Sequence, residues 1–182
     1  MRRAVFLDRD GVLNKAIMRN GKPYPPRDLS ELIIAEGACT SLDVLRREGF
    51  VLVVVTNQPD IARGKANRAD VDKINTRLVD LLPLDAVEVC EHDDEDQCDC
   101  RKPKPGMILR LQRRLVLDLE HSFMIGDRWR DIEAGRRAGC RTVLIGDGYG
   151  ESFPSAPSVK VASLPEAAAW IVQQGRFEQE IA

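Results

Sequence analysis

Residues 50–56 read FVLVVVT, an unbroken run of apolar residues that is rich in valine. A strand with one face in water alternates apolar and polar residues, whereas an unbroken apolar run is typical of a strand buried on both faces. Strands of that kind belong to parallel sheets that carry helices on both sides. The run therefore predicts the central part of an α/β fold.

Short apolar runs alternate with stretches of helical periodicity along the rest of the chain. Further strands are predicted at residues 4–7, 86–90, 122–125 and 142–145, and helices at 37–48, 67–81, 105–115, 131–138 and 163–174. Residues 8–30 and 91–105 are predicted to be loops, with a small extended piece at 32–34. This alternation predicts a mostly parallel sheet with helices on both faces. We expect one domain over residues 1–182, without a large cap domain.

The charge balance narrows the class of partner. The 182 residues include 27 Lys and Arg and 29 Asp and Glu, which gives a formal net charge of −2. Such a chain has no overall positive field for nucleic acid or for an anionic membrane surface. No stretch approaches the roughly 18 consecutive apolar residues of a membrane span, and the first apolar run stops at Asp8, too early for a signal peptide. We therefore expect a cytoplasmic monomer whose partner is a small molecule.

Polar residues follow the predicted strands at the point where each strand ends. These groups are Asp8 with Asp10, Thr56 to Gln58, a loop of Cys and His residues after residue 90, and Gly126 with Asp127. The carboxyl ends of parallel strands meet at one edge of a sheet, where ligands of α/β proteins bind. We therefore expect all of these groups in one site.

The carboxylates of this edge are candidate magnesium ligands. Asp8 and Asp10 are two positions apart, so on an extended chain their side chains point the same way. Carboxylates at such short range repel one another unless a cation or a proton joins them. Asp127, at the end of another strand, adds a third carboxylate. Oxygen ligands of this kind suit Mg²⁺, which often meets a substrate phosphate.

A phosphate-binding site is predicted beside these carboxylates. Lys102, in the sequence CRKPKPGM, offers a compact cation, and Arg101 offers a planar fork that binds phosphate through two donors. Thr56 adds a hydroxyl donor at the end of its strand. Lys104 is an alternative to Lys102, because the sequence does not decide which lysine turns inward.

The loop at residues 90–100 carries a second metal signal. Cys90, His92, Cys98 and Cys100 form a Cys₃His set, a combination that binds structural zinc. The chain has five cysteines, and an odd count in a cytoplasmic protein disfavours a disulfide framework. The set directly precedes Arg101 and Lys102, so a zinc ion there would fix the phosphate-binding residues in place.

Four motifs, taken in order, resemble those of the haloacid dehalogenase-type phosphatases. They are Asp8-x-Asp10-Gly-Val, Thr56 after an apolar strand, Lys102, and Gly126-Asp127-x-x-x-Asp131. The resemblance extends from residue 4 to about residue 146. It implies a Rossmann-like sheet and a reaction through an aspartyl-phosphate.

The same resemblance implies a role for each matching residue. Asp8 would be the nucleophile, and Asp10 would protonate the leaving group and then activate water. Thr56 and Lys102 would hold the phosphoryl oxygens. Asp8, the main-chain carbonyl of Asp10, and Asp127 would bind Mg²⁺.

The segments FLDRDGVLN, VVVTNQ, IARGK and CRKPKPGM, together with the Cys/His loop, resemble one branch of that family more closely. It contains the D-glycero-D-manno-heptose 1,7-bisphosphate 7-phosphatases and the histidinol-phosphate phosphatases. Similarity to the heptose enzymes implies a sugar bisphosphate substrate that contacts Arg101 and Arg128, beside Asn57 and Gln58. Histidinol phosphate, or another small phosphorylated metabolite, is the alternative substrate. A non-catalytic module stabilised by zinc is the alternative of another class.

Several other residues are not assigned to the predicted site. Arg9 is expected to point away from its neighbours Asp8 and Asp10 and is given no chemical role. Cys39 and Cys140 are expected to be buried. The sequence leaves three roles open, those of Arg63, Lys65 and Trp129.

Overall fold

A six-stranded parallel sheet forms the centre of the computed structural model, which describes residues 1–181, with side chains through residue 175. Its order is β5 (Ala86–Cys90), β4 (Val51–Asn57), β1 (Arg2–Leu7), β6 (Leu117–Gly126), β7 (Arg141–Ile145) and β8 (Val159–Val161). The predicted α/β fold is confirmed, and the valine-rich run forms β4, next to the strand that ends at Asp8.

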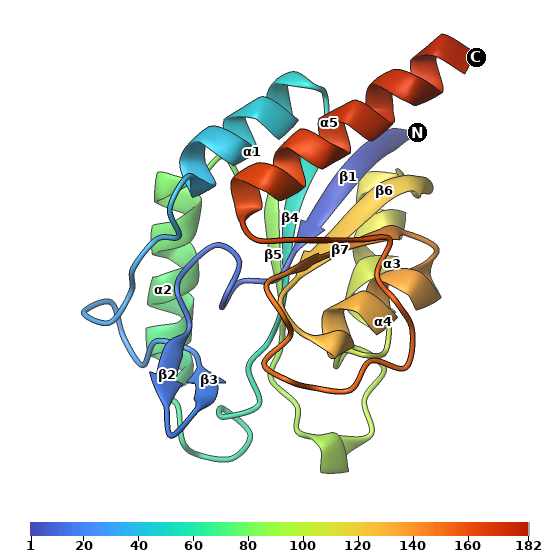
Figure 1. The fold of residues 1–182 in the computed structure, drawn as a ribbon. Helices are drawn as coiled ribbons and strands as arrows, with labels where there is room; N and C mark the ends of the chain where they lie inside the picture. Colours follow the sequence, from blue (N-terminus) through green and yellow to red (C-terminus); the bar gives the residue numbers. More distant parts are fainter. Residues whose placement is uncertain (182) are drawn as a thin grey trace.

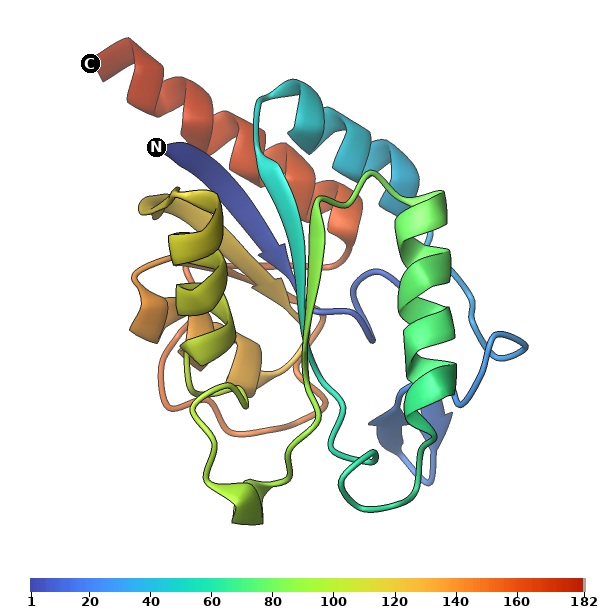
Figure 2. The same ribbon diagram turned by 180° about the vertical axis from the view of Figure 1, so that it is seen from behind.

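Helices cover both faces of the sheet, as Figures 1 and 2 show from opposite sides. One face packs against α1 (Ala38–Arg47), α2 (Arg68–Leu81) and α5 (Leu164–Ile181), and the other against α3 (Gly106–Leu115) and α4 (Trp129–Ala138). Alternate residues of β1 divide between these two cores: Val5 and Leu7 face the first, and Ala4 and Phe6 face the second. Burial on both faces is the physical reason why the strands read as unbroken apolar runs.

Capping groups explain several of the helix boundaries that the sequence predicts. The Asn67 side chain accepts a hydrogen bond from the main-chain N–H of Ala69 at the start of α2. Gly139 closes α4 with φ of 91°, a left-handed conformation that glycine adopts without strain. At the start of α5, the Ser163 hydroxyl accepts from the N–H of Glu166.

Two small pieces of β structure were not predicted. The expected loop at 8–30 contains a hairpin of β2 (Ile17–Arg19) and β3 (Lys22–Tyr24), and β8 extends the sheet edge. The hairpin had a readable signal, because Asn20 and Gly21 both have positive φ and Asn-Gly is a preferred hairpin turn. Of the extended piece expected at 32–34, Ile34 makes a single bridge to Asn14.

One prediction about side-chain burial is wrong. Cys39 is exposed near the start of α1, whereas Cys140 is buried as expected. Leu81, in the last turn of α2, is exposed. Asn75 is buried on this helix together with Val71 and Leu78.

The carboxyl ends of the strands and the β2–β3 hairpin lie at one end of the molecule, and the termini lie at the other (Figure 1). The loop between β5 and α3 projects at the same end as the hairpin and contains a short 3₁₀ helix at Asp94–Asp96. No helix in the described part of the chain is both long enough and apolar enough to span a membrane.

Candidate active site

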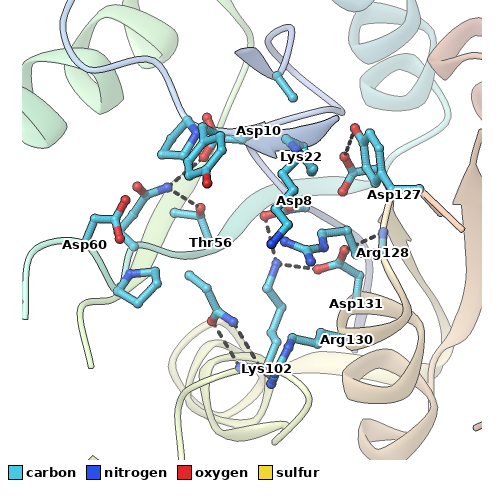
Figure 3. Close-up of a pocket in the computed structure, with 18 of the residues that line it drawn as sticks. Asp8, Asp10, Lys22, Thr56, Asp60, Lys102, Asp127, Arg128, Arg130 and Asp131 are labelled. Atoms are coloured by element: carbon cyan, nitrogen blue, oxygen red, sulfur yellow. Dashed lines mark hydrogen bonds and ion pairs between the residues drawn. The ribbon is translucent and has the colours of Figure 1, made fainter. Parts of the chain in front are cut away.

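A cavity of about 550 Å³ opens at the carboxyl ends of the strands (Figure 3). It is lined by every residue that the sequence predicts to act on the substrate, to bind it or to hold magnesium. These residues are Asp8, Asp10, Thr56, Asn57, Gln58, Arg101, Lys102, Asp127 and Arg128. The hairpin adds Lys22 and Tyr24, and Arg63 and Arg130 also line the cavity. The strand ends therefore assemble one site, as the sequence indicated.

Three buried carboxylates meet at the floor of this cavity. Asp8, Asp127 and Asp131 each place one oxygen within 4.8 Å of the others. Burial raises the pKa of Asp8 from 3.8 to about 7, with Lys102 opposing and Asp131 adding to the effect. Burial, and then the charges of Asp8 and Asp131, also raise the pKa of Asp127. One oxygen of Asp127, Oδ1, is buried and has no hydrogen-bond partner. The cluster therefore fits a divalent cation with oxygen ligands.

Lys102 is the lysine that turns inward. Its ammonium lies 2.8 Å from Asp8 Oδ1 and 2.6 Å from Asp131 Oδ1, and donates to the Val55 carbonyl at 2.7 Å. Burial lowers the pKa of Lys102, but the charges of Asp131 and Asp8 outweigh that effect and raise it. Lys104 instead donates to two carbonyls of the Cys/His loop. The alternative that the sequence left open is thereby decided.

Asn57 holds the backbone of Lys102. Its side-chain carbonyl accepts from the Lys102 N–H at 3.1 Å, and its amide donates to the Lys102 carbonyl at 3.0 Å. Both polar ends of this amide are therefore engaged by the protein. Gln58 is also engaged, because its amide donates to Thr56 Oγ1 at 2.9 Å and to Asp10 Oδ2 at 2.7 Å.

The Asp10 carboxylate is not a member of the three-carboxylate cluster, because the chain does not stay extended beyond Asp8 as the expected common direction of the two side chains required. The chain turns directly after Asp8, and the N–H groups of Leu13 and Asn14 both donate to the Arg9 carbonyl. In this turn the Asp10 carboxylate accepts hydrogen bonds from the Arg9 guanidinium. Arg9 was expected to point away from Asp10, and that expectation is wrong.

Two residues of the β7–β8 loop reach the site, and neither belongs to a motif that sequence analysis recognised. The Tyr149 hydroxyl donates to Asp127 Oδ2 at 2.7 Å. Glu151 forms an ion pair with Arg128, with Nε to Oε1 at 3.0 Å. Gly11 makes room for this arrangement, since a Cβ there would lie 1.7 Å from Asp127 Oδ2.

The predicted zinc ligands come together in the loop after β5. The Cys90, His92, Cys98 and Cys100 ligand atoms all lie within 4.8 Å of one another, and all the cysteines are free thiols. Sulfur atoms bound to one zinc lie about 3.8 Å apart, and the three Sγ–Sγ distances are 3.2, 3.3 and 3.8 Å. Burial raises the pKa of the Cys90 thiol, so a cation is needed to hold this sulfur as a thiolate.

Arg101 connects this loop to the cavity. Its Nε donates to Asp94 Oδ1 at 2.8 Å, and Nη1 donates to the His92 carbonyl. Arg63 lies on the same side and binds the Asp93 carboxylate through two nitrogen atoms. The Cys/His loop thus contacts two arginines of the cavity wall.

Comparison with known proteins identifies the family of this chain. Residues 99–167 match the family model described as HAD-hydrolase-like. The chain is 36% identical over 160 residues to the D-glycero-beta-D-manno-heptose-1,7-bisphosphate 7-phosphatase of Pasteurella multocida, covering 81% of this chain and 84% of the relative. The Pseudomonas aeruginosa protein of the same name is 35% identical over 154 residues, covering 82% and 84%.

Solved structures agree with these relatives. The D,D-heptose 1,7-bisphosphate phosphatase from B. bronchiseptica, complexed with magnesium and phosphate, has a TM-score of 0.79 at 30% identity, over 94% of this chain and 99% of that chain. A putative HAD-like phosphatase from Mesorhizobium loti has a TM-score of 0.76 at 30% identity, covering 94% and 87%. The chain therefore belongs to the haloacid dehalogenase-like phosphatases, in the family of the heptose bisphosphate phosphatases.

Proposed function

We propose that this phosphatase uses Mg²⁺ and an aspartyl-phosphate intermediate to release the 7-phosphate of D-glycero-D-manno-heptose 1,7-bisphosphate. The observation that carries the mechanism is the buried Asp8, paired with Lys102 at 2.8 Å at the floor of the cavity. The names of the relatives support the substrate.

Two half-reactions follow from these residues. An Asp8 oxygen attacks phosphorus, the bond to the sugar oxygen breaks, and Asp10 gives a proton to that leaving oxygen. Water then attacks the phosphorus, passes a proton to Asp10, and the bond to Asp8 breaks to free phosphate. Thr56 and Lys102 hold the phosphoryl oxygens through both steps.

Magnesium fits the carboxylate cluster. Asp8, Asp127 and the main-chain carbonyl of Asp10 would hold it, and the unpartnered Asp127 Oδ1 supports this assignment. When bound, the ion would neutralise charge on the phosphoryl oxygens and on the clustered carboxylates. Asp131 pairs with Lys102 at 2.6 Å, so its negative charge is balanced by the lysine.

Arg101 and Arg128 are the proposed contacts for the distal phosphate. Each guanidinium already has a carboxylate partner, Asp94 for Arg101 and Glu151 for Arg128. A phosphate carries more charge than a carboxylate and accepts bidentate hydrogen bonds, so it can compete for either arginine. Zinc held by the four Cys and His ligands would keep the loop before Arg101 in place.

A substrate panel tests the proposed substrate. Purified protein with Mg²⁺ is expected to hydrolyse the heptose bisphosphate with kcat/KM about 100-fold above that for histidinol phosphate, because only the former presents a second phosphate to Arg101 and Arg128. Release of inorganic phosphate is the measurement. The reverse order of rates would replace the proposed substrate with histidinol phosphate.

Replacement of the nucleophile tests the covalent mechanism. Asp8→Asn is expected to lower kcat by about 10⁴-fold or more, since the amide oxygen cannot form the aspartyl-phosphate. The circular dichroism spectrum should be unchanged. Asp72→Asn, a change on the exposed side of α2, is the matched control and should retain full activity. Substantial phosphate release by Asp8→Asn would exclude this nucleophile.

Magnesium affinity is expected to depend on pH. The pKa of Asp8 rises from 3.8 to about 7 on folding, so its ionisation destabilises the metal-free protein as the pH rises across that interval. Because Mg²⁺ binds the ionised carboxylates, it should raise Tm by at least about 3 °C more at pH 8 than at pH 5. Thermal melts of EDTA-treated protein with and without Mg²⁺ measure this. Equal shifts at both pH values would contradict the assignment.

Metal analysis tests the zinc site. Protein purified without chelators is expected to contain about one zinc per chain, and Cys98→Ser should lose it because one of four ligands is removed. Cys39→Ser, a change outside the cluster, is the control and should keep the metal. Zinc-free protein that remains fully active and equally stable would show that the loop needs no metal.

A further inference from the structure

Among the side chains that the structure describes, Arg9 is the largest that is fully buried, with 0% of its surface exposed, and the proposed mechanism gives it no role. A guanidinium stays charged in proteins, and its burial is costly unless hydrogen bonds and an opposite charge compensate for it. A buried arginine beside an active site therefore calls for a specific explanation.

The guanidinium joins Asp10 to a helix on one face of the sheet. Arg9 Nε lies 3.1 Å from both carboxylate oxygens of Asp10, and Nη2 lies 3.0 Å from Oδ2. On its other side, Nη1 donates to Asn75 Oδ1 at 2.9 Å. Asn75 is buried on the apolar stripe of α2, where an asparagine without a partner would destabilise the helix packing.

Other donors complete the restraint on Asp10. Asn14 Nδ2 donates to Oδ1 at 3.0 Å, and Gln58 Nε2 donates to Oδ2 at 2.7 Å. The Asp10 side chain still keeps 14% of its surface exposed and lines the cavity. Its carboxylate is thus fixed in orientation while it remains accessible to a substrate.

The two aspartates of the motif therefore have separate cations. Asp8 is paired with Lys102, and Asp10 is paired with Arg9, whose guanidinium also contacts Asn75 of α2. A planar guanidinium that contacts both oxygens restrains rotation of a carboxylate, which the point charge of an ammonium does not. Proton transfer requires that carboxylate within about 3 Å of the leaving oxygen, so its orientation affects the rate.

We propose that Arg9, held by Asn75, is a positioning residue that aims the Asp10 carboxylate at the leaving-group oxygen. The inference rests on the proposed function only in giving Asp10 the role of acid and base. It does not depend on which sugar phosphate is the substrate.

Leaving-group dependence tests the role of Arg9. A sugar oxygen leaves only when protonated, whereas p-nitrophenolate leaves without a proton. Arg9→Met is expected to lower kcat/KM about 100-fold for a sugar phosphate that the unmodified enzyme hydrolyses, and less than about 5-fold for p-nitrophenyl phosphate. Hydrolysis of the aspartyl-phosphate still needs Asp10, so the variant should show a burst of p-nitrophenolate followed by slow turnover.

Asp10→Asn provides the reference. If this variant shows no difference between the two leaving groups, Asp10 is not the acid, and the proposed mechanism fails together with the inference. If Asp10→Asn shows the difference but Arg9→Met lowers kcat/KM equally for both substrates, Arg9 is only structural and the inference alone fails.

Two further variants separate a loss of positioning from a loss of folded protein. Asn75→Ala removes the anchor and keeps the arginine, and it is expected to show the same leaving-group pattern with a loss of about 10-fold. Arg46→Met removes an arginine that is ion-paired with Asp85 on the surface, and it should change neither kcat/KM. If Arg9→Met does not fold and Asn75→Ala shows no leaving-group dependence, the proposal is rejected.

Discussion

The ammonium of Lys102, buried between Asp8 and Asp131, is the interaction on which the rest of the site depends. It joins the end of β1 and the first turn of α4 to the segment that precedes α3, and its hydrogen bond to the Val55 carbonyl adds β4. A charge in this position is stable only if its partners are also fixed. The surrounding structure holds these groups in place: Asn57 binds the Lys102 backbone, and the main-chain N–H of Arg128 donates to Asp131.

The Cys/His loop holds residues of the cavity wall in place. Cys100 is followed directly by Arg101 and Lys102, and Lys104 donates back to the Cys98 carbonyl. A metal that closes the loop would therefore act on the phosphate site without touching the substrate. The β7–β8 loop holds two other residues of the cavity in place, because Tyr149 binds Asp127 and Glu151 binds Arg128.

Asp8 and Asp10 show how two identical residues, two positions apart, acquire different surroundings. Asp8 is buried with two other carboxylates, and its pKa is raised to about 7, while Lys102 lies against it. Asp10 is surrounded by donors from Arg9, Asn14 and Gln58. The first environment fits the proposed role of Asp8 as a nucleophile beside a metal, and the second fits the proposed role of Asp10 in moving protons from a fixed orientation.

The sequence alone determined the sheet, the helices on both faces and the edge where the site lies. Burial on both faces leaves unbroken apolar runs, and the strands end at polar motifs such as Asp8 and Thr56. Only the tertiary structure decided between Lys102 and Lys104, and only it paired Arg9 with Asp10 and Asn75. These outcomes depend on the direction of each side chain after the strands end, where neither strand nor helix periodicity applies. Asn75 lies 66 positions from Arg9 along the chain, so packing of α2 against the sheet decides that contact.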